Sequence, residues 1–415
     1  MFMLVDCDNF FVSCERIFQP ALKNRPVVVL SNNDGCVVSR SYEAKALKIP
    51  MGCPFFKIEK SFKSQNGIAL SSNYELYADI SKRIMAFLEY HFRHIEIYSI
   101  DEAFIRLGNT ENLEETAAFV RNEILRQIGI SVSVGIAASK TLAKIAAAMA
   151  KSKKEDKWQI LTDDSIINHR LSGLKVVDIW GVGRRCAGRL NFLGIFTALD
   201  LKKAPLKLLR SNFGIPMEKT AMELNGYACL EIEPDTPQQT IITSRSFEFE
   251  ISDLCKLKQI IAEFTDNACL RLRRQNSKAG GIVTLLQTNR FHHTLPQYNN
   301  QCLTTLPRPS NYTAAFIAAA QQGLEQIYRP EYHYKRAGVM LIDICSLNRP
   351  SDFFADTAAE QKEQKLMTAI DALNHKLGKK TVFFAAQAAG VRHYIKREFR
   401  SGSFTTSWDG LALVK

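Results

Sequence analysis

Two apolar segments of this chain end in carboxylates, which few folds tolerate. Residues 2–8 are apolar up to Asp6 and Asp8, and the mostly apolar residues 95–100 lead to Asp101 and Glu102. Their lengths and composition predict two buried strands. Burying clustered acids is unfavourable unless cations neutralise them, and hard oxygen ligands of this kind suit Mg²⁺ carrying substrate phosphates. The pattern therefore predicts a two-metal phosphoryl-transfer enzyme.

The geometry of a strand sets a condition on these acids. Side chains alternate between faces, so Asp101 and Glu102 can serve one site only if the backbone bends between them, as at the tip of a hairpin beside the strand of Asp6. With that bend, Asp6 and Asp101 could bridge two Mg²⁺ ions about 3.5–4 Å apart, with Glu102 completing the first site. The backbone carbonyl of Cys7 could add a neutral ligand. In the alternative interpretation, each acid caps a turn or pairs with Arg or Lys. For one acid alone that interpretation is favoured, and only the occurrence of both Asp6 and Asp101 at the ends of apolar segments favours a catalytic role.

The overall charge indicates a polyanionic partner. Lysine and arginine number 54 against 42 acidic residues, a formal net charge of +12, which is typical of nucleic-acid-binding proteins but also of many basic proteins that bind none. No segment approaches the roughly 18 apolar residues of a membrane span, so we expect a cytoplasmic protein without membrane contact. Ten cysteines without a Cys-x-x-Cys pair indicate reduced thiols rather than disulfides or a zinc site.

The domain organisation follows from length and composition. At 415 residues the chain is too long for one core, and we expect an α+β multidomain protein. Strands and helices mix over residues 1–165, and short helices separated by Gly and Pro occupy 166–231. Acids and prolines mark an extended linker at 232–240. A compact α+β layer follows at 241–345, and 346–415 form a tail with one helix, at 358–377.

An alanine-rich helix beginning near Ser139 carries a lysine stripe. At 100° per residue, Lys140, Lys144 and Lys151 lie within about 40° of each other, opposite an apolar face. Such a stripe is usually solvated, yet a helix that follows a core strand could equally aim Lys144 at a triphosphate. A Walker loop at 135–141 is excluded, because Val134 and Ser139 occupy positions where that motif requires glycine.

A glycine-rich hairpin at residues 180–183 precedes two arginines. Gly181 and Gly183 could expose backbone N–H groups that bind a phosphate without reading a base. A dinucleotide-binding loop is disfavoured, because no strand precedes this segment and Cys186 occupies the third glycine position. The domain after the linker is basic. Its arginines could contact a duplex, or they could simply form a solvated helix face. These arginines are Arg245, Arg271, Arg273, Arg274 and Arg290.

Together these features resemble the Y family of translesion DNA polymerases, and most closely its UmuC branch, the catalytic subunits of bacterial DNA polymerase V. The resemblance spans essentially the whole chain. Its most specific blocks occur in order at residues 6–11, 31–36, 43–47, 71–77, 98–102 and 140–144.

The resemblance implies a right-hand polymerase fold. The palm would comprise residues 1–18 and 72–165, the fingers 19–71, and a helix-hairpin-helix thumb 166–231. A linker at 232–240 would lead to a C-terminal little-finger domain at 241–345. The tail at 346–415 would be a partner-binding region.

The family also assigns roles to individual residues. Asp6, Asp101 and Glu102 would be the catalytic metal ligands, and Phe11 would be the steric gate that rejects the ribose 2′-hydroxyl. UmuC-like proteins commonly carry Tyr at that position, so Phe11 implies that selection against ribonucleotides persists but differs in strictness. Tyr42, Lys45 and Lys144 would contact the dNTP triphosphate. DNA would be bound by Gly181, Gly183 and Arg184 of the thumb and by Ser244, Arg245 and Ser246 of the first little-finger strand.

The resemblance further implies a set of partners. These are primed template DNA, dNTP, two Mg²⁺ ions, a processed UmuD-like dimer and a RecA filament, in SOS mutagenesis in the bacterial cytoplasm and at the nucleoid. Residues 350–354 align with the family's sliding-clamp peptide but lack its leading glutamine, so clamp binding is a weaker expectation.

Two other functions compete with template-directed DNA synthesis past lesions. A nucleotidyl cyclase could use a palm-like sheet with paired acids, but it would leave the thumb hairpin and the basic C-terminal domain unexplained. A non-catalytic DNA scaffold that recruits repair partners is disfavoured by intact acids at positions 6, 101 and 102.

Overall fold

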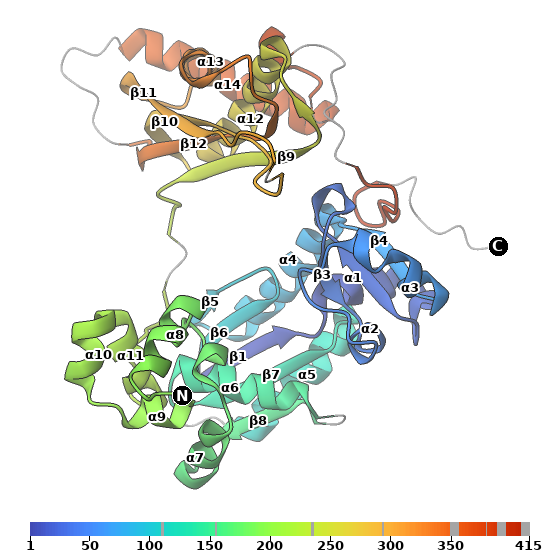
Figure 1. Cartoon of the computed structure of the whole chain (residues 1–415), viewed down its shortest axis with the longest axis vertical. Helices are drawn as coiled ribbons and strands as arrows, with labels where there is room; N and C mark the ends of the chain where they lie inside the picture. Colours follow the sequence, from blue (N-terminus) through green and yellow to red (C-terminus); the bar gives the residue numbers. More distant parts are fainter. Residues whose placement is uncertain are drawn as a thin grey trace. The chain divides into compact units, whose positions relative to one another are not determined.

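The computed structural model describes residues 1–108, 112–153, 156–233, 236–292, 294–348, 357–378, 380–387 and 396–407. The chain folds into two compact units (Figure 1). The first comprises Met1–Asp235 together with Arg397–Lys415, and the second comprises Thr236–Lys396. The first unit is therefore built from both ends of the chain.

A five-stranded sheet forms the centre of the first unit. Its order is β5 (Ile95–Ile97), β6 (Glu102–Arg106), β1 (Phe2–Cys7), β7 (Val132–Ala137) and β8 (Trp158–Leu161). The central strand β1 runs antiparallel to both β6 and β7. All six residues of β1 are buried, as expected for a strand that is covered on both faces.

The two faces of this sheet have separate cores. Met3, Val5 and Cys7 pack with α1 (Phe10–Phe18), α4 (Tyr74–His91) and α5 (Leu113–Ile128). Phe2 and Leu4 pack with α6 (Lys140–Lys151) and the helices that follow it. Because strand side chains alternate, Asp6 belongs to the face covered by α6.

Close approach of α6 to the sheet depends on Gly135 in β7. A Cβ at this position would overlap the backbone nitrogen of Ala147 and the backbone oxygen of Ala143. Ser139 caps the helix by accepting from Leu142 N at 3.3 Å and donates to the carbonyl of Glu223 at 2.7 Å. Residues 135–141 therefore form a tight strand-to-helix junction, in agreement with the exclusion of a Walker loop.

A smaller three-stranded sheet forms its own lobe. Its order is β3 (Val37–Arg40), β2 (Val27–Leu30) and β4 (Ile68–Ser71), with β4 parallel to β2 and at an edge. Helices α2 (Tyr42–Ala46) and α3 (Glu59–Ser64) pack on it. The 3₁₀ turns of this part of the chain are Pro20–Leu22, Asn32–Asp34 and Phe55–Lys57.

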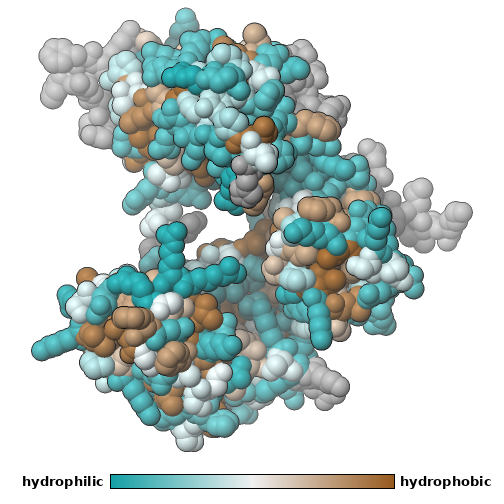
Figure 2. Space-filling view, viewed as in Figure 1, coloured by the Kyte–Doolittle hydropathy of each residue, from teal (hydrophilic) through white to brown (hydrophobic). Residues whose placement is uncertain are grey.

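Five short helices follow the main sheet, around the 3₁₀ turn η4 (Val176–Asp178). They are α7 (Asp164–Ser172), α8 (Arg184–Phe192), α9 (Ala198–Lys203), α10 (Leu206–Phe213) and α11 (Ile215–Leu224). Glu223 is fully buried and accepts hydrogen bonds from Thr141 N, at 2.8 Å, and from Leu230 N, at 3.1 Å, so it ties α11 to the start of α6. Hydrophobic surface is visible over α8, α10 and α11 (Figure 2), where Phe192 and Ile215 are exposed.

The second unit is a four-stranded antiparallel sheet covered by helices. The strand order is β11 (Asn299–Ser310), β10 (Ser277–Gln287), β12 (Tyr334–Ser346) and β9 (Ile241–Ile251). Helices α12 (Leu254–Arg274) and α13 (Thr313–Ile327) form the core with this sheet. Strand β11 was not expected from the sequence.

The expected tail at 346–415 is not one segment. Helix α14 (Thr357–Leu377) packs on the second unit, where Arg273 donates to both carboxylate oxygens of Asp371 at 2.7 and 2.9 Å. The 3₁₀ turn Ala385–Gln387 lies in the same unit. Residues 397–407 return to the first unit. The helix expected at 358–377 begins one residue earlier, whereas the long-range contacts that divide the tail leave no local pattern.

Candidate active site

The structure places Asp6 beside Glu102 and puts Asp101 in the adjoining turn. Asp6 and Glu102 are paired opposite each other on β1 and β6. Asp101 lies in the turn that joins β5 to β6, and its carbonyl accepts from Cys7 N at 2.9 Å. Tyr98 N and Ser99 N both donate to Glu102 O at 3.1 Å, which closes the turn. The chain therefore bends over residues 99–101, which puts Asp101 in the turn and Glu102 at the start of β6.

Three lysines of α6 pair with acids of the sheet. Lys151 Nζ lies 2.6 Å from Asp6 Oδ1, Lys144 Nζ lies 2.9 Å from Glu102 Oε2, and Lys140 Nζ lies 2.5 Å from Glu96 Oε2. The stripe is thus turned toward the sheet and is not a solvated face. Lys140 is 2% exposed, so its charge must be compensated by the acid it meets.

The partly or fully buried carboxylates of this site require positive charges close to them. Burial raises the pKa of Asp6 to about 7, against the opposing attraction of Lys151 and with a further increase from the charge of Glu102. Burial lowers the pKa of Lys151, but attraction to Asp6, Asp8 and Glu102 together outweighs it, and the net shift is upward. In the described part of the chain, no three His, Cys, Asp or Glu side chains converge on a point where a metal ion could sit. Here the ammonium groups hold the oxygens of Asp6 and Glu102, and an all-oxygen donor set of this charge fits a hard divalent cation.

Phe11 lies on α1 against two tyrosines of α4. Its ring stacks on Tyr77 with the centroids 4.5 Å apart and an interplanar angle of 12°, and meets the edge of Tyr74 at 6.1 Å. Stacked and edge-on aromatic pairs of this kind restrict the orientation of a ring. The tyrosine rings therefore fix the orientation of Phe11.

Tyr42 and Lys45 form a basic cluster with Arg40, Lys151 and Lys157. Lys157 Nζ donates to Tyr42 Oη at 2.9 Å and pairs with Asp8 at 2.7 Å. Burial lowers the pKa of Lys45, and the nearby charges of Lys151 and Arg40 lower it further. Lys151 is part of the predicted lysine stripe, but no contact with the triphosphate was predicted for it. Its spacing of seven residues from Lys144, which puts both on one helix face, was the signal that could have indicated such a contact. For Lys157 the sequence offered none.

Lys144 has different neighbours from those expected. Besides its pair with Glu102, its ammonium lies 4.6 Å from the ring centroid of Tyr98 and 5.4 Å from that of Trp180. Trp180 Nε1 donates to Tyr98 Oη at 2.9 Å. Lys151, and not Lys144, is among the charges that act on Lys45.

The glycine hairpin lies at the exposed start of α8. Gly181 has a positive φ of 84°, and Gly183 is the N-cap of the helix. Neither glycine has a heavy atom within 4 Å of where a Cβ would stand, and Arg184 beside them is exposed. The backbone N–H groups at this helix start can therefore be approached by an anion.

Ser244, Arg245 and Ser246 lie on β9, at an edge of the four-stranded sheet. Arg245 and Ser246 are exposed and Ser244 is partly exposed. Ser244 Oγ accepts from Arg336 of β12 at 2.8 Å, so this edge carries two arginines.

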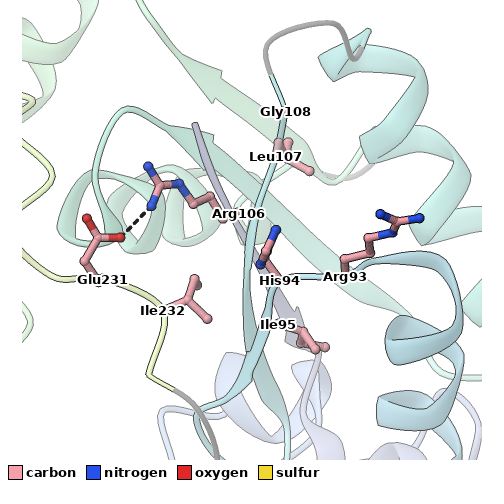
Figure 3. Close-up of a pocket in the computed structure, with 8 residues that line it drawn as sticks. All are labelled: Arg93, His94, Ile95, Arg106, Leu107, Gly108, Glu231 and Ile232. Atoms are coloured by element: carbon pink, nitrogen blue, oxygen red, sulfur yellow. Dashed lines mark hydrogen bonds and ion pairs between the residues drawn. The ribbon is translucent and has the colours of Figure 1, made fainter.

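A cavity of about 530 Å³ lies away from these acids. Figure 3 shows that Arg106 and Glu231 pair at its rim beside His94 and Ile232. Arg106 ends β6, whereas Glu102 begins it, so the cavity is at the other end of that strand and is not the carboxylate site.

Comparison with known proteins identifies the fold and the family. A Y-family DNA polymerase chimera of Dbh and Dpo4 superimposes with a TM-score of 0.66 at 25% identity, covering 83% of this chain and 99% of that structure. The chain is therefore a Y-family DNA polymerase, with the palm, fingers, thumb and little finger of that fold, and it acts in translesion synthesis. It belongs to the impB/mucB/samB family, whose model matches residues 5–148 and whose C-terminal domain model matches 238–353.

Curated relatives agree with this assignment. Protein UmuC of Salmonella typhimurium is 41% identical over the full length of both chains. DNA polymerase IV of Desulfatibacillum aliphaticivorans is 25% identical over 93% of this chain and 96% of its own. The Y-family prediction is confirmed, and neither the cyclase nor the non-catalytic scaffold is favoured. Membership of this family implies dependence on a divalent metal.

Residues 364–414 match a model described as a domain of unknown function. Among the described residues, no helix is both long and apolar enough to cross a membrane.

Proposed function

We propose that this chain is a template-directed DNA polymerase whose catalytic metal ligands are Asp6, Asp101, Glu102 and the backbone carbonyl of Cys7, and whose metal is Mg²⁺, with two ions in each site. The pairing of Asp6 with Glu102 across β1 and β6 carries this proposal. When bound, Mg²⁺ would activate the primer 3′-hydroxyl and neutralise charge on the α-phosphate and the pyrophosphate.

The protein's own groups orient the triphosphate. Tyr42, Lys45 and Lys151 form one basic surface next to Asp6, and phosphate oxygens can replace carboxylates as partners of these ammonium groups. Lys144 balances the charge of Glu102 and contacts the triphosphate only if that pair opens. Primer extension on a primed template with Mg²⁺ and dNTPs tests the function. A cyclic product formed from NTP without DNA would support the cyclase instead.

We further propose that Phe11 is the steric gate. Replacement by alanine removes a ring that is supported by Tyr74 and Tyr77, so the ribose 2′-hydroxyl should gain space. We expect Phe11→Ala to raise ribonucleotide incorporation relative to dNTP incorporation by about 10²-fold, as for the loss of a well-packed contact of ~3 kcal/mol. Single-nucleotide insertion kinetics with dNTP and rNTP measure this ratio. An unchanged ratio would remove Phe11 from the role.

Edge strand β9 and the thumb hairpin are proposed to hold the DNA backbone. Arg245 is exposed on β9, where it can neutralise a phosphate. We expect Arg245→Ala to weaken binding of primed DNA by a similar factor for all sequences and to reduce the slope of log K against log salt by about one. Titrations at several salt concentrations measure both values. An unchanged slope would contradict the contact.

Other partners are proposals from family membership. Primed template DNA and dNTP are supported by solved structures of similar polymerases, one titled as an insertion ternary complex of Dbh DNA polymerase. A processed UmuD-like dimer, a RecA filament, a role in SOS mutagenesis and a bacterial cytoplasmic location are proposed from the likeness to UmuC. The clamp-peptide prediction falls on residues 350–354, which lie outside the described residues.

A further inference from the structure

The chain's last described segment, residues 397–407, is docked on the fingers. We refer to it as the C-terminal strap. Ser71 N donates to Phe399 O at 3.0 Å and Phe399 N donates to Ser71 Oγ at 3.0 Å. A parallel bridge joins Ser71 to Arg400. The strap thus extends the sheet at the edge strand β4, and Figure 1 shows the red C-terminal segment beside that strand.

Contacts along its length hold the strap in place. Glu398 N donates to Asp34 Oδ2 at 2.9 Å. The rings of Phe404 and Phe18 stack with centroids 5.0 Å apart and planes inclined by 5°. Phe399 meets the edge of Phe55 at 6.4 Å. Apolar and polar contacts at separate points favour one fixed register for the strap.

Ser401 in the middle of the strap reaches a buried acid. Glu15 of α1 is fully buried, and burial raises its pKa. Ser401 Oγ donates to Glu15 Oε1 at 3.0 Å, and Tyr77 Oη donates to the same oxygen at 2.7 Å. Asn73 Nδ2 donates to Ser401 Oγ at 2.9 Å and so fixes the serine in turn. A buried carboxyl must keep such donors, because leaving it unsatisfied is costly.

The same acid lies behind the proposed gate. Tyr77 is fully buried, and its hydroxyl is held by Glu15 while its ring stacks on Phe11. A continuous line of contacts therefore runs from Ser401 through Glu15 and Tyr77 to the ring of Phe11. The strap lies within the region that matches a domain of unknown function, yet it forms part of the surroundings of the active site.

We propose that Ser401, Glu15 and Tyr77 are positioning residues for the gate, so that the C-terminal strap helps the polymerase to discriminate between dNTP and rNTP. This inference rests on the proposed role of Phe11. Without the hydroxyl of Ser401, the carboxylate of Glu15 loses one hydrogen-bond donor and moves toward another. Tyr77, which donates to the same oxygen, moves with it, and the ring that stacks on Phe11 is then no longer held in one position.

The experiment uses the full chain and measures kcat and KM for insertion of one dNTP and of the matching rNTP. The variants are Ser401→Ala, Ser401→Thr, Tyr77→Phe and Phe11→Ala, with Thr406→Ala as control, because Thr406 is exposed on the same strap. We expect Ser401→Ala and Tyr77→Phe each to lower discrimination about tenfold, as for one lost hydrogen bond to a buried charged group. Ser401→Thr keeps a hydroxyl and should retain discrimination, as should the control.

The outcomes separate this inference from the proposal it rests on. If Phe11→Ala leaves discrimination unchanged, the gate role fails and the positioning role fails with it. If Phe11→Ala lowers discrimination while Ser401→Ala and Tyr77→Phe match the control, the gate stands and the strap's role is overturned. An equal loss of kcat/KM for dNTP and rNTP would also overturn it, because a merely structural role leaves the ratio unchanged. If Ser401→Ala does not fold, Tyr77→Phe decides between these outcomes by the same comparison with the control.

Discussion

Replacement of Asp101 by asparagine should abolish primer extension while the protein still folds. Asp101 lies in the turn that precedes Glu102, and its carboxylate accepts from Ser99 Oγ at 2.6 Å. Asparagine can keep that acceptor but not the negative charge. Loss of a charged metal ligand should lower kcat by about 10³-fold or more, at least as much as loss of one oxyanion-hole donor. Extension of a labelled primer in Mg²⁺ measures the effect.

A matched control is Asp79→Asn. Asp79 forms an exposed pair with Arg83 one turn along α4, with their nearest atoms 2.9 Å apart, and such pairs contribute at most about 1 kcal/mol to stability. The control should extend primers like the unaltered protein. Retained extension by Asp101→Asn, with a thermal unfolding curve like that of the control, would rule out the two-metal assignment.

Gly135→Ala should be the most destabilising of these small substitutions. An added Cβ would overlap the backbone of α6 at Ala143 and Ala147, and backbone atoms cannot rotate away as a side chain can. We expect a loss of about 3 kcal/mol or more in the free energy of unfolding, at the upper end for overpacked cores. Because α6 carries Lys144 and Lys151, a protein that survives should also lose activity. Urea unfolding and primer extension measure the two effects.

The control for this substitution is Gly188→Ala in α8. Gly188 is exposed within the helix, and no heavy atom lies within 4 Å of where its Cβ would stand. Alanine favours a helix over glycine by roughly 0.5–1 kcal/mol, so this variant should be slightly more stable. If both variants unfolded at the same urea concentration, the close approach of α6 would not be needed.

The sequence alone was enough to find the elements whose signal is local. Asp6 lies near the end of the buried strand β1, as predicted, but Glu102 begins β6, and the expected buried strand before it is the short, partly exposed β5. The lysine stripe followed from helical periodicity, and its partners are the acids of the sheet. The Y-family resemblance was confirmed because motifs along the whole chain carry it.

The features that were not predicted are a strand of mostly polar residues and contacts between residues far apart in the sequence. The sequence of strand β11 is typical of a loop, because most of its residues are polar and it contains Pro307 and Pro309. Edge strands accept proline, and β11 is at an edge of its sheet. The partnership of Lys157 with Asp8 joins residues 149 positions apart. Contacts between Ser401 and Glu15 span 386 positions. No local pattern encodes such pairs, because they depend on which elements the whole fold brings together.

The order of synthesis on the ribosome gives the C-terminal strap another consequence. The little-finger unit lies between the palm and the strap in the chain, so it must leave the exit tunnel before Ser401 can reach Glu15. A nascent palm would therefore hold a buried glutamate with an incomplete set of donors until translation is nearly finished. Premature stop codons near the end of the message should accordingly yield a polymerase with altered selectivity, and not only one that lacks a tail.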